Sequence, residues 1–251
     1  MAKEKTADKT TEKLMSLYQT DNRLMNDSID RLVVKLFIYK QQCQKNTILL
    51  SGCGSGNGTT MVAINLAVAL AGSGWKTLLV DTDMRKSMKY KRLNNNAAGL
   101  SDYLEGDADQ SKIIGQTDKE ELSYVQCGEP KTNAVRLLSS KRMLSFVSTA
   151  RDSFDFVVLD CPSLTVVPDA TVLFPSVDMI ALVLSLNITT KKQLERAKQE
   201  ISNCDEKYAG LIVNRVDKRQ YSNAFPQYDY FEESNMRKSH KRAMRKANVK
   251  E

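Results

Sequence analysis

The chain has 251 residues, 41% of them hydrophobic and 27% charged, which is enough for one sizeable α/β core with tails. No apolar run approaches the roughly 18 residues that span a bilayer, and the N-terminus lacks the apolar stretch of a signal peptide. The formal net charge of +7 is concentrated at the C-terminal end, so the rest of the chain is nearly neutral, which argues against nucleic acid as a partner.

The number and spacing of the cysteines bear on the compartment in which the chain folds. There are five of them, an odd number, and no two form a C-x-x-C pair. Such a set predicts neither a disulfide framework nor a zinc site, and we expect ordinary small apolar thiols in a reducing cytosol.

Two segments begin the chain. Residues 1–25 are polar and aperiodic, and we expect them to be flexible. In residues 27–43, DSIDRLVVKLFIYKQQC, apolar side chains recur at spacings of three and four, which is typical of an amphipathic helix. The apolar positions are Ile29, Leu32, Val33, Leu36 and Phe37.

Short runs rich in Val, Ile and Leu follow, separated by helical patterns. They are TILLS (47–51), KTLLVD (76–81), LSYVQC (122–127), FDFVVLD (154–160), MIALVLS (179–185) and AGLIVN (209–214). Several are apolar throughout, as strands buried on both faces are. The alternation predicts an α/β domain over 26–218, with a doubly wound, mostly parallel sheet and helices on both faces.

The stretch SGCGSGNGTT, 51–60, lies between the first run and an Ala-rich helical pattern. Gly54, Gly56 and Gly58 permit positive φ and close backbone approach, so successive N–H groups could face a phosphate. The usual phosphate loop ends in G-K-[ST], whereas Thr59 stands here in place of the lysine. A tight turn without a ligand is the alternative interpretation.

Carboxylates end two further runs. Asp81 and Asp83, with Arg85 beyond them, follow LLV, and Asp160 ends FVVL. Ligands of such sheets bind at the carboxyl ends of the strands, where these side chains would meet the loop. A strand-ending Asp can also be a helix cap.

Taken together, these motifs resemble the cytoplasmic domain of the bacterial tyrosine kinases of capsular and extracellular polysaccharide synthesis. The similarity covers GNGTTMVAINLAVALAGSGWKTLLVDTDMRKS, GLSDYLEG, FDFVVLDCPS, PDA and GLIVNRVD. This family belongs to the deviant P-loop group that includes the Min and Par ATPases. The DxDxR element, residues 81–85, separates the kinases from those ATPases.

The resemblance implies ATP or ADP and Mg²⁺ as cofactors and gives roles to matched positions. It implies nucleotide contacts by Gly56, Asn57, Gly58, Thr59, Thr60, Asn214 and Arg215. It implies magnesium contacts by Thr60, Asp81 and Asp160, and catalytic roles for Asp81, Asp83 and Arg85. Phosphoacceptors would be Tyr221, Tyr228 and Tyr230 in the tail, for which an ordinary aromatic-polar tail is the alternative.

The departures from the family pattern concern catalysis and assembly. Thr59 and Gly54 occupy the positions of the two lysines of the wider group, and Arg85 or Lys86 could supply a substitute charge. The subunit-contact pattern E-x-x-R-x-x-R appears as Asp27, Asp30 and Val33, so a homo-oligomer stays open. We therefore expect weakened or lost phosphotransfer; a pseudokinase scaffold and a partitioning-type ATPase are the alternatives.

The tail over 219–251 ends in a basic segment. Residues 236–251 hold seven Lys and Arg against one Glu, and their paired spacing of four would place them on one helix face. Such a stripe predicts attraction to anionic lipid headgroups or an acidic partner, and a solvated end is the alternative. With the resemblance, this predicts a cytoplasmic protein at the inner face of the plasma membrane, docked to a transmembrane polysaccharide co-polymerase.

Overall fold

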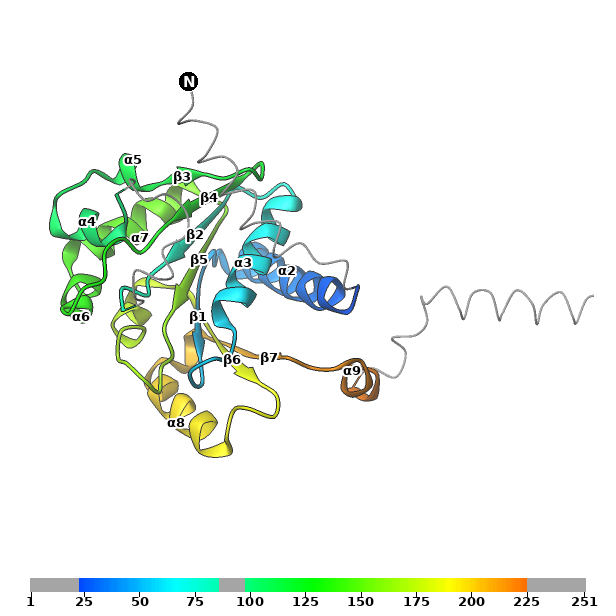
Figure 1. Cartoon of the computed structure of the whole chain (residues 1–251). Helices are drawn as coiled ribbons and strands as arrows, with labels where there is room; N and C mark the ends of the chain where they lie inside the picture. The colour runs from blue at the N-terminus through cyan, green and yellow to red at the C-terminus, as the bar shows by residue number, and fades with distance from the viewer. Residues whose placement is uncertain (1–22, 86–97, 225–251) are drawn as a thin grey trace, which may run out of the picture. The chain divides into compact units, whose positions relative to one another are not determined.

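The computed structural model of the chain describes residues 23–85 and 98–224 (Figure 1). By contacts the chain divides into two units, Met1–Asn214 and Arg215–Glu251, which are described separately. The first unit holds the sheet and all of the described helices except one. Within the second, the structure describes the helix α9, Lys218–Ala224.

The described strands form one seven-stranded sheet in the order β3-β4-β2-β5-β1-β6-β7. All neighbours pair in parallel except β3 and β4, which are antiparallel. The strands are β1 Thr47–Gly52, β2 Thr77–Asp81, β3 Gly115–Gln116, β4 Leu122–Val125, β5 Phe156–Cys161, β6 Met179–Ser185 and β7 Tyr208–Asn214. The predicted mostly parallel α/β fold is confirmed, as are its six apolar strands.

Of the described helices of this unit, the first precedes β1 and the others lie between strands. They are α2 Arg23–Cys43, α3 Thr59–Gly72, α4 Leu100–Glu105, α5 Gln110–Ile113, α6 Ala134–Leu138, α7 Lys141–Ser153 and α8 Lys191–Ile201, with 3-10 helices η2 Thr171–Ser176 and η3 Ser202–Lys207. The amphipathic helix predicted over 27–43 is confirmed; α2 begins one turn earlier and ends at the expected residue.

Helices cover both faces of the sheet, with α2 and α3 on one face and α4, α6 and α7 on the other (Figure 1). Successive strand residues alternate between the two cores: Leu50 packs with α3, whereas Leu49 packs with the helices of the opposite face. This burial on both sides explains why the strands read as continuous apolar runs.

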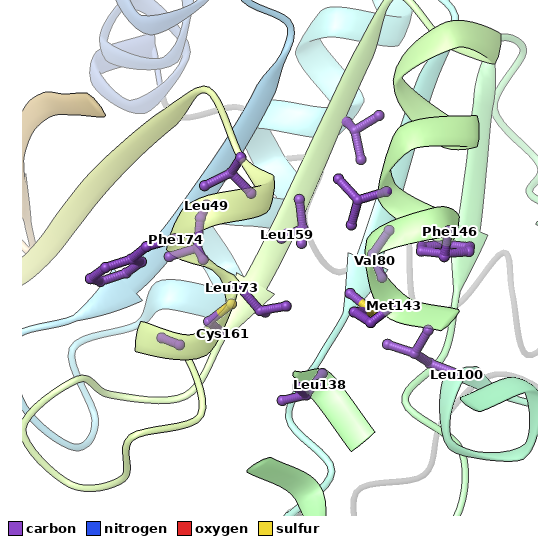
Figure 2. Packing of buried hydrophobic residues seen from close by; sticks show 14 of the residues in the cluster. Leu49, Val80, Leu100, Leu138, Met143, Phe146, Leu159, Cys161, Leu173 and Phe174 are labelled. Atoms are coloured by element: carbon purple, nitrogen blue, oxygen red, sulfur yellow. The ribbon is translucent and has the colours of Figure 1, made fainter. Parts of the chain in front are cut away.

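The larger core lies on the α7 face. There α7 begins at the cap residue Ser140, whose hydroxyl accepts a hydrogen bond from the Met143 N–H at 3.3 Å. Figure 2 shows labelled members of this core from strands, α7 and η2, among them Leu49, Val80, Met143, Phe146, Leu159, Leu173 and Phe174. This packing fixes the sheet from which the polar strand ends project.

The polar strand ends meet at one edge of the sheet. Since β5 lies between β2 and β1, the loop after β1 is next to the end of β5 and one strand away from the end of β2. Asp81 of β2 lies directly opposite Asp160 of β5 in the strand register. The predicted convergence of these strand ends is therefore present.

Candidate functional site

The phosphate loop comprises residues 53–58 between β1 and α3. Gly56 and Gly58 have φ of 73° and 79°, a conformation that residues with a Cβ rarely adopt. Gly58 is also the N-cap of α3 and provides no side-chain cap. The first amide groups of the 14-residue helix α3 thus remain available to an anion, to which the positive end of the helix dipole adds.

Hydrogen bonds from the segment after β5 hold the start of this loop. The Ser163 hydroxyl and the Leu164 N–H donate to the carbonyl of Gly52 at 3.0 and 3.1 Å. The Thr165 hydroxyl donates to the carbonyl of Cys53 at 2.9 Å. The loop is therefore fastened to the strand end that carries Asp160.

A second group of polar side chains holds the end of the loop. Asn57 is only 2% exposed, and its Nδ2 donates to the Thr189 hydroxyl at 2.9 Å. The carbonyl of Asn57 accepts a hydrogen bond from Nδ2 of Asn214, also at 2.9 Å. A Cβ on Gly58 would overlap the Asn214 amide, which is a second reason for glycine there. Asn214, the expected adenine contact, lies under the loop in this structure.

Thr59 begins α3 where other phosphate loops carry lysine. Its hydroxyl lies 3.0 Å from where a Cβ on Gly52 would be, so the side chain turns toward the end of β1. A Cβ on Gly54, the other lysine position, would lie 2.8 Å from Nε2 of Gln193 in α8. Neutral groups therefore stand at both positions where the resemblance would place a lysine.

Thr82, directly after β2, links the ends of β2 and β5 through the backbone of Asp160. Its N–H and hydroxyl both donate to the backbone carbonyl of Asp160, at 3.0 and 2.9 Å. The Asp83 N–H donates to the Asp81 side chain at 3.0 Å. Asp160 is 3% exposed. These bonds fix the two strand ends relative to each other.

The donor set is compatible with magnesium. Within residues 23–85 and 98–224, no three His, Cys, Asp or Glu side chains gather into a complete metal site. Mg²⁺ does not require one, because it is usually held by one or two carboxylates together with substrate phosphates and water. Asp81, Asp160 and the Thr60 hydroxyl, in the first turn of α3, supply oxygen ligands of the required kind.

Arg85 forms a bidentate ion pair that the sequence did not reveal. Its Nε and Nη2 donate to the two carboxylate oxygens of Asp169 at 2.7 and 2.8 Å. Asp169 is fully buried, whereas the Arg85 side chain is 37% exposed. This hydrogen bonding raises the pKa of Arg85 above its usual value. Arg85 thus neutralises Asp169, and Lys86, the other candidate for a substitute charge, lies outside the described residues.

Two buried cysteines lie beside the site. Burial raises the pKa of Cys53 to about 11, and burial likewise raises the pKa of Cys161, whose Sγ lies 3.0 Å from the Thr82 hydroxyl oxygen. Both thiols stay neutral at physiological pH, as a small apolar residue would, and add no charge next to a phosphate.

The remaining predicted site residues belong to the second unit. Arg215, with φ of 58°, begins it, and Tyr221 lies in α9 and is only 8% exposed. Tyr228, Tyr230 and the basic segment lie outside the described residues. Across the described part of the chain, no helix combines the length and apolarity needed to span a membrane.

Sequence and structure comparisons agree with this geometry. Residues 48–240 match the CobQ/CobB/MinD/ParA nucleotide binding domain. The chain is 31% identical to the tyrosine-protein kinase CpsD of Streptococcus pneumoniae, over 68% of this chain and 76% of that protein. Its structure superposes on the kinase domain of the Escherichia coli tyrosine kinase ETK with a TM-score of 0.72 and 28% identity, covering 77% of this chain and 76% of that chain.

A more distant structure shares the fold alone. It is the septum site-determining protein MinD of Pyrococcus horikoshii, solved with Mg-ADP. The TM-score is 0.57 at 21% identity, covering 71% of this chain and 76% of that chain.

Proposed function

The chain belongs to the CobQ/CobB/MinD/ParA nucleotide-binding family and, within it, to the bacterial tyrosine kinases, and on this premise we propose a function. It binds ATP or ADP with Mg²⁺ and acts as a tyrosine autokinase-like regulator of capsular or extracellular polysaccharide synthesis or export. Its phosphotransfer is weakened or lost. A transmembrane co-polymerase and the anionic inner leaflet are the proposed partners at the membrane.

The observation that carries the proposal is the retained phosphate loop beside two paired carboxylates. The left-handed Gly56 and Gly58 and the free amides of α3 form an anion cradle, and Asp81 and Asp160 are in register at its rim. ATP with Mg²⁺ would supply the phosphoryl group and the cation that balances its charge. Backbone amides would bind the phosphates, Asp81, Asp160 and the Thr60 hydroxyl would orient the cation, and Asp83 would face the incoming hydroxyl.

Thr59 is the reason for expecting weak transfer. In phosphoryl transfer the protein contributes mostly positioning and electrostatic stabilisation. Removing one such charged or donor group typically costs roughly 100-fold or more in rate, about 3 kcal/mol. The backbone amides, the helix dipole and the carboxylates do not depend on the residue at position 59. Nucleotide binding would therefore be retained even where phosphoryl transfer is weak or lost.

A pseudokinase scaffold is the second candidate function. It is favoured by the Arg85–Asp169 pair, because a guanidinium held by a buried carboxylate is not free to take over from the missing lysine. In that case the fold docks the membrane co-polymerase and nucleotide is dispensable. The DxDxR element weighs against a partitioning-type ATPase, which remains the third candidate.

Calorimetric titration with ATP, with and without Mg²⁺, tests the proposal. We expect weak, magnesium-dependent binding that Gly58→Ala abolishes, because the new Cβ would be strained at φ 79° and would overlap Asn214. Gly72→Ala at the end of α3 is the matched control, since its Cβ meets nothing within 4 Å. No binding to folded protein at millimolar ATP would overturn the proposal in favour of the scaffold.

A second experiment restores the missing positive charge by substitution and measures both ATP binding and tyrosine phosphorylation. Thr59→Lys should tighten ATP binding and increase tyrosine phosphorylation together, and Thr59→Met, similar in length but uncharged, should do neither. If Thr59→Lys folds and binds ATP more tightly without phosphorylating tyrosine, the nucleotide site stands and the kinase assignment does not.

A further inference from the structure

The end of the phosphate loop is held by the side chains of Thr189 and Asn214, and the kinase resemblance assigns no role to Thr189. We propose that Thr189 is a positioning residue of the nucleotide site, which acts with Asn214 on Asn57 to hold a lysine-free phosphate loop in its anion-binding shape. We name these three residues the Asn57 clamp. The inference rests on the proposed nucleotide binding and adds to it how the loop stays ordered.

The first argument is the entropy of the loop. Three of its six residues are glycines, and ordering glycine costs more backbone entropy than ordering any other residue. The bonds from Ser163, Leu164 and Thr165 reach only Gly52 and Cys53, at the start of the loop. The glycine-rich part that would face a phosphate therefore needs support from elsewhere.

The second argument is the geometry of the clamp. Nδ2 of Asn57 donates to the Thr189 hydroxyl, which also accepts the Ser185 N–H at 2.9 Å, so the acceptor is itself fixed to the end of β6. The carbonyl of Asn57 receives the Asn214 amide from the end of β7. Asn57 is thus held through both its side chain and its backbone, one residue before the left-handed Gly58.

The third argument is that the clamp is not arranged for stability alone. Among the described residues, Oδ1 of Asn57 is buried without a hydrogen-bond partner. A buried carbonyl oxygen without a partner opposes folding. Alanine at this position would avoid that penalty, so the amide serves to hold the loop rather than to stabilise the fold.

The test compares variants at Thr189 in the nucleotide-free and ATP-bound protein. Thr189→Val keeps the shape of the side chain but removes the acceptor, and Thr189→Ser keeps the acceptor. Thr149→Val is the matched control, because the Thr149 hydroxyl bonds only within α7, to the Ser145 carbonyl at 3.0 Å, and is exposed. The measurements are ¹⁵N backbone order parameters of Gly54, Gly56 and Gly58 and the affinity for ATP with Mg²⁺.

In the wild type we expect the order parameters of these glycines to be about 0.85. In Thr189→Val they should fall below about 0.6, while the order parameters of β1 and α7 stay unchanged. ATP affinity should weaken roughly three- to ten-fold in Thr189→Val, the effect of one lost hydrogen bond, and return in Thr189→Ser. Thr149→Val should match the wild type in both measurements.

Three results would contradict the proposed clamp. They are low order parameters of the loop glycines in the wild type, order parameters of these glycines that are the same in Thr189→Val as in the wild type, or a loss of order in Thr189→Val that extends over the whole domain. Should Thr189→Val fail to fold, Asn57→Ala carries the same test. It should leave the thermal midpoint little changed yet loosen the glycines, whereas a lowered midpoint with an ordered loop would contradict the proposal. If the wild type binds no ATP, the nucleotide function fails, and the order parameters still decide whether the clamp exists.

Discussion

Arg85 and Asp169 show how one residue of the DxDxR element is used. The carboxylate of Asp169 is fully buried, so without Arg85 its charge would be left uncompensated in the core. The pair lies 84 residues apart in the chain and joins the segment after β2 to the segment before η2. Arg85 therefore holds the edge of the site together, whatever further part it has in catalysis.

Removing this guanidinium should destabilise the fold. Breaking a buried ion pair typically costs about 3–5 kcal/mol, and because Arg85 is partly exposed to screening solvent we expect Arg85→Ala to cost about 2 kcal/mol. Arg85→Lys should recover only part of this, since lysine cannot donate in the bidentate fork. Urea denaturation measures both changes in the free energy of unfolding.

The matched control is a second ion pair between separate segments of the chain, Lys131 with Glu105 at 2.6 Å, whose side chains are 22% and 30% exposed. Neither of its partners is fully buried, so Lys131→Ala should cost less than about 1 kcal/mol. If Arg85→Ala costs no more than Lys131→Ala, Asp169 is not held by the pair, and the argument fails.

Among the elements, α2 packs on one face of the sheet and also forms an ion pair with the residue before β5. Lys40 donates to the Asp155 carboxylate at 2.9 Å, while the Lys76 N–H donates to its other oxygen at 3.1 Å. The Lys40 ammonium also lies 5.5 Å from the centre of the Trp75 ring. Burial alone would raise the pKa of Asp155, but these hydrogen bonds outweigh it and lower that pKa.

This ion pair should depend on pH in a defined direction. A lowered folded-state pKa contributes stability above the unfolded value, about 3.9, that is lost as pH falls through the folded value. Since Asp155 is 39% exposed, we expect Asp155→Asn to cost only about 0.5–1 kcal/mol near neutral pH. The difference from wild type should vanish in strong acid, as thermal unfolding across a pH series would show.

The control for this prediction is Asp109→Asn, which removes an 80%-exposed carboxylate from a 3.7 Å pair with Lys112 in the short helix α5. Its stability should follow the wild type at every pH. A constant difference between Asp155→Asn and wild type down to strong acid would mean that the side chain contributes through shape and not through its charge.

Periodicity predicted the elements that bury apolar runs. α2 shows spacings of three and four, and β1, β5 and β6 are buried almost throughout, so their composition alone indicates strands. β3 was not predicted, because Gly115–Gln116 is two residues long, exposed, and held only by antiparallel pairing with Ser123 and Tyr124. A strand defined by its partner leaves no pattern of its own.

Some residues of the candidate site could likewise be predicted from the sequence, and others could not. Asp81 and Asp160 could be predicted to meet, because both end apolar runs and parallel strands end at one edge. Thr189 and Asp169 could not, since a threonine before a helix and an aspartate after a proline are ordinary cap and turn residues. Their roles arise from segments that only the folded sheet brings together.

On the scale of the whole molecule, charge separates the tail from the body. Residues 236–251 carry a net +6, and the remainder carries +1. Basic residues close to an anionic leaflet contribute about 1 kcal/mol each, and salt screens this attraction. Such energies recruit a protein reversibly, whereas stable anchoring would need the proposed transmembrane partner. Phosphate on Tyr228 or Tyr230 would add roughly −1.5 to −2 charges each and oppose recruitment.

Sedimentation with anionic vesicles tests the tail in the intact protein. We expect the full chain to pellet at low salt and to be released at high salt, and a truncation ending at Asn235 to stay in the supernatant. Deletion of residues 1–22, which have four basic and four acidic residues, is the matched control and should pellet like the full chain. Equal pelleting of the full chain and the Asn235 truncation would show that the basic segment is a solvated end, leaving any membrane recruitment to a protein partner.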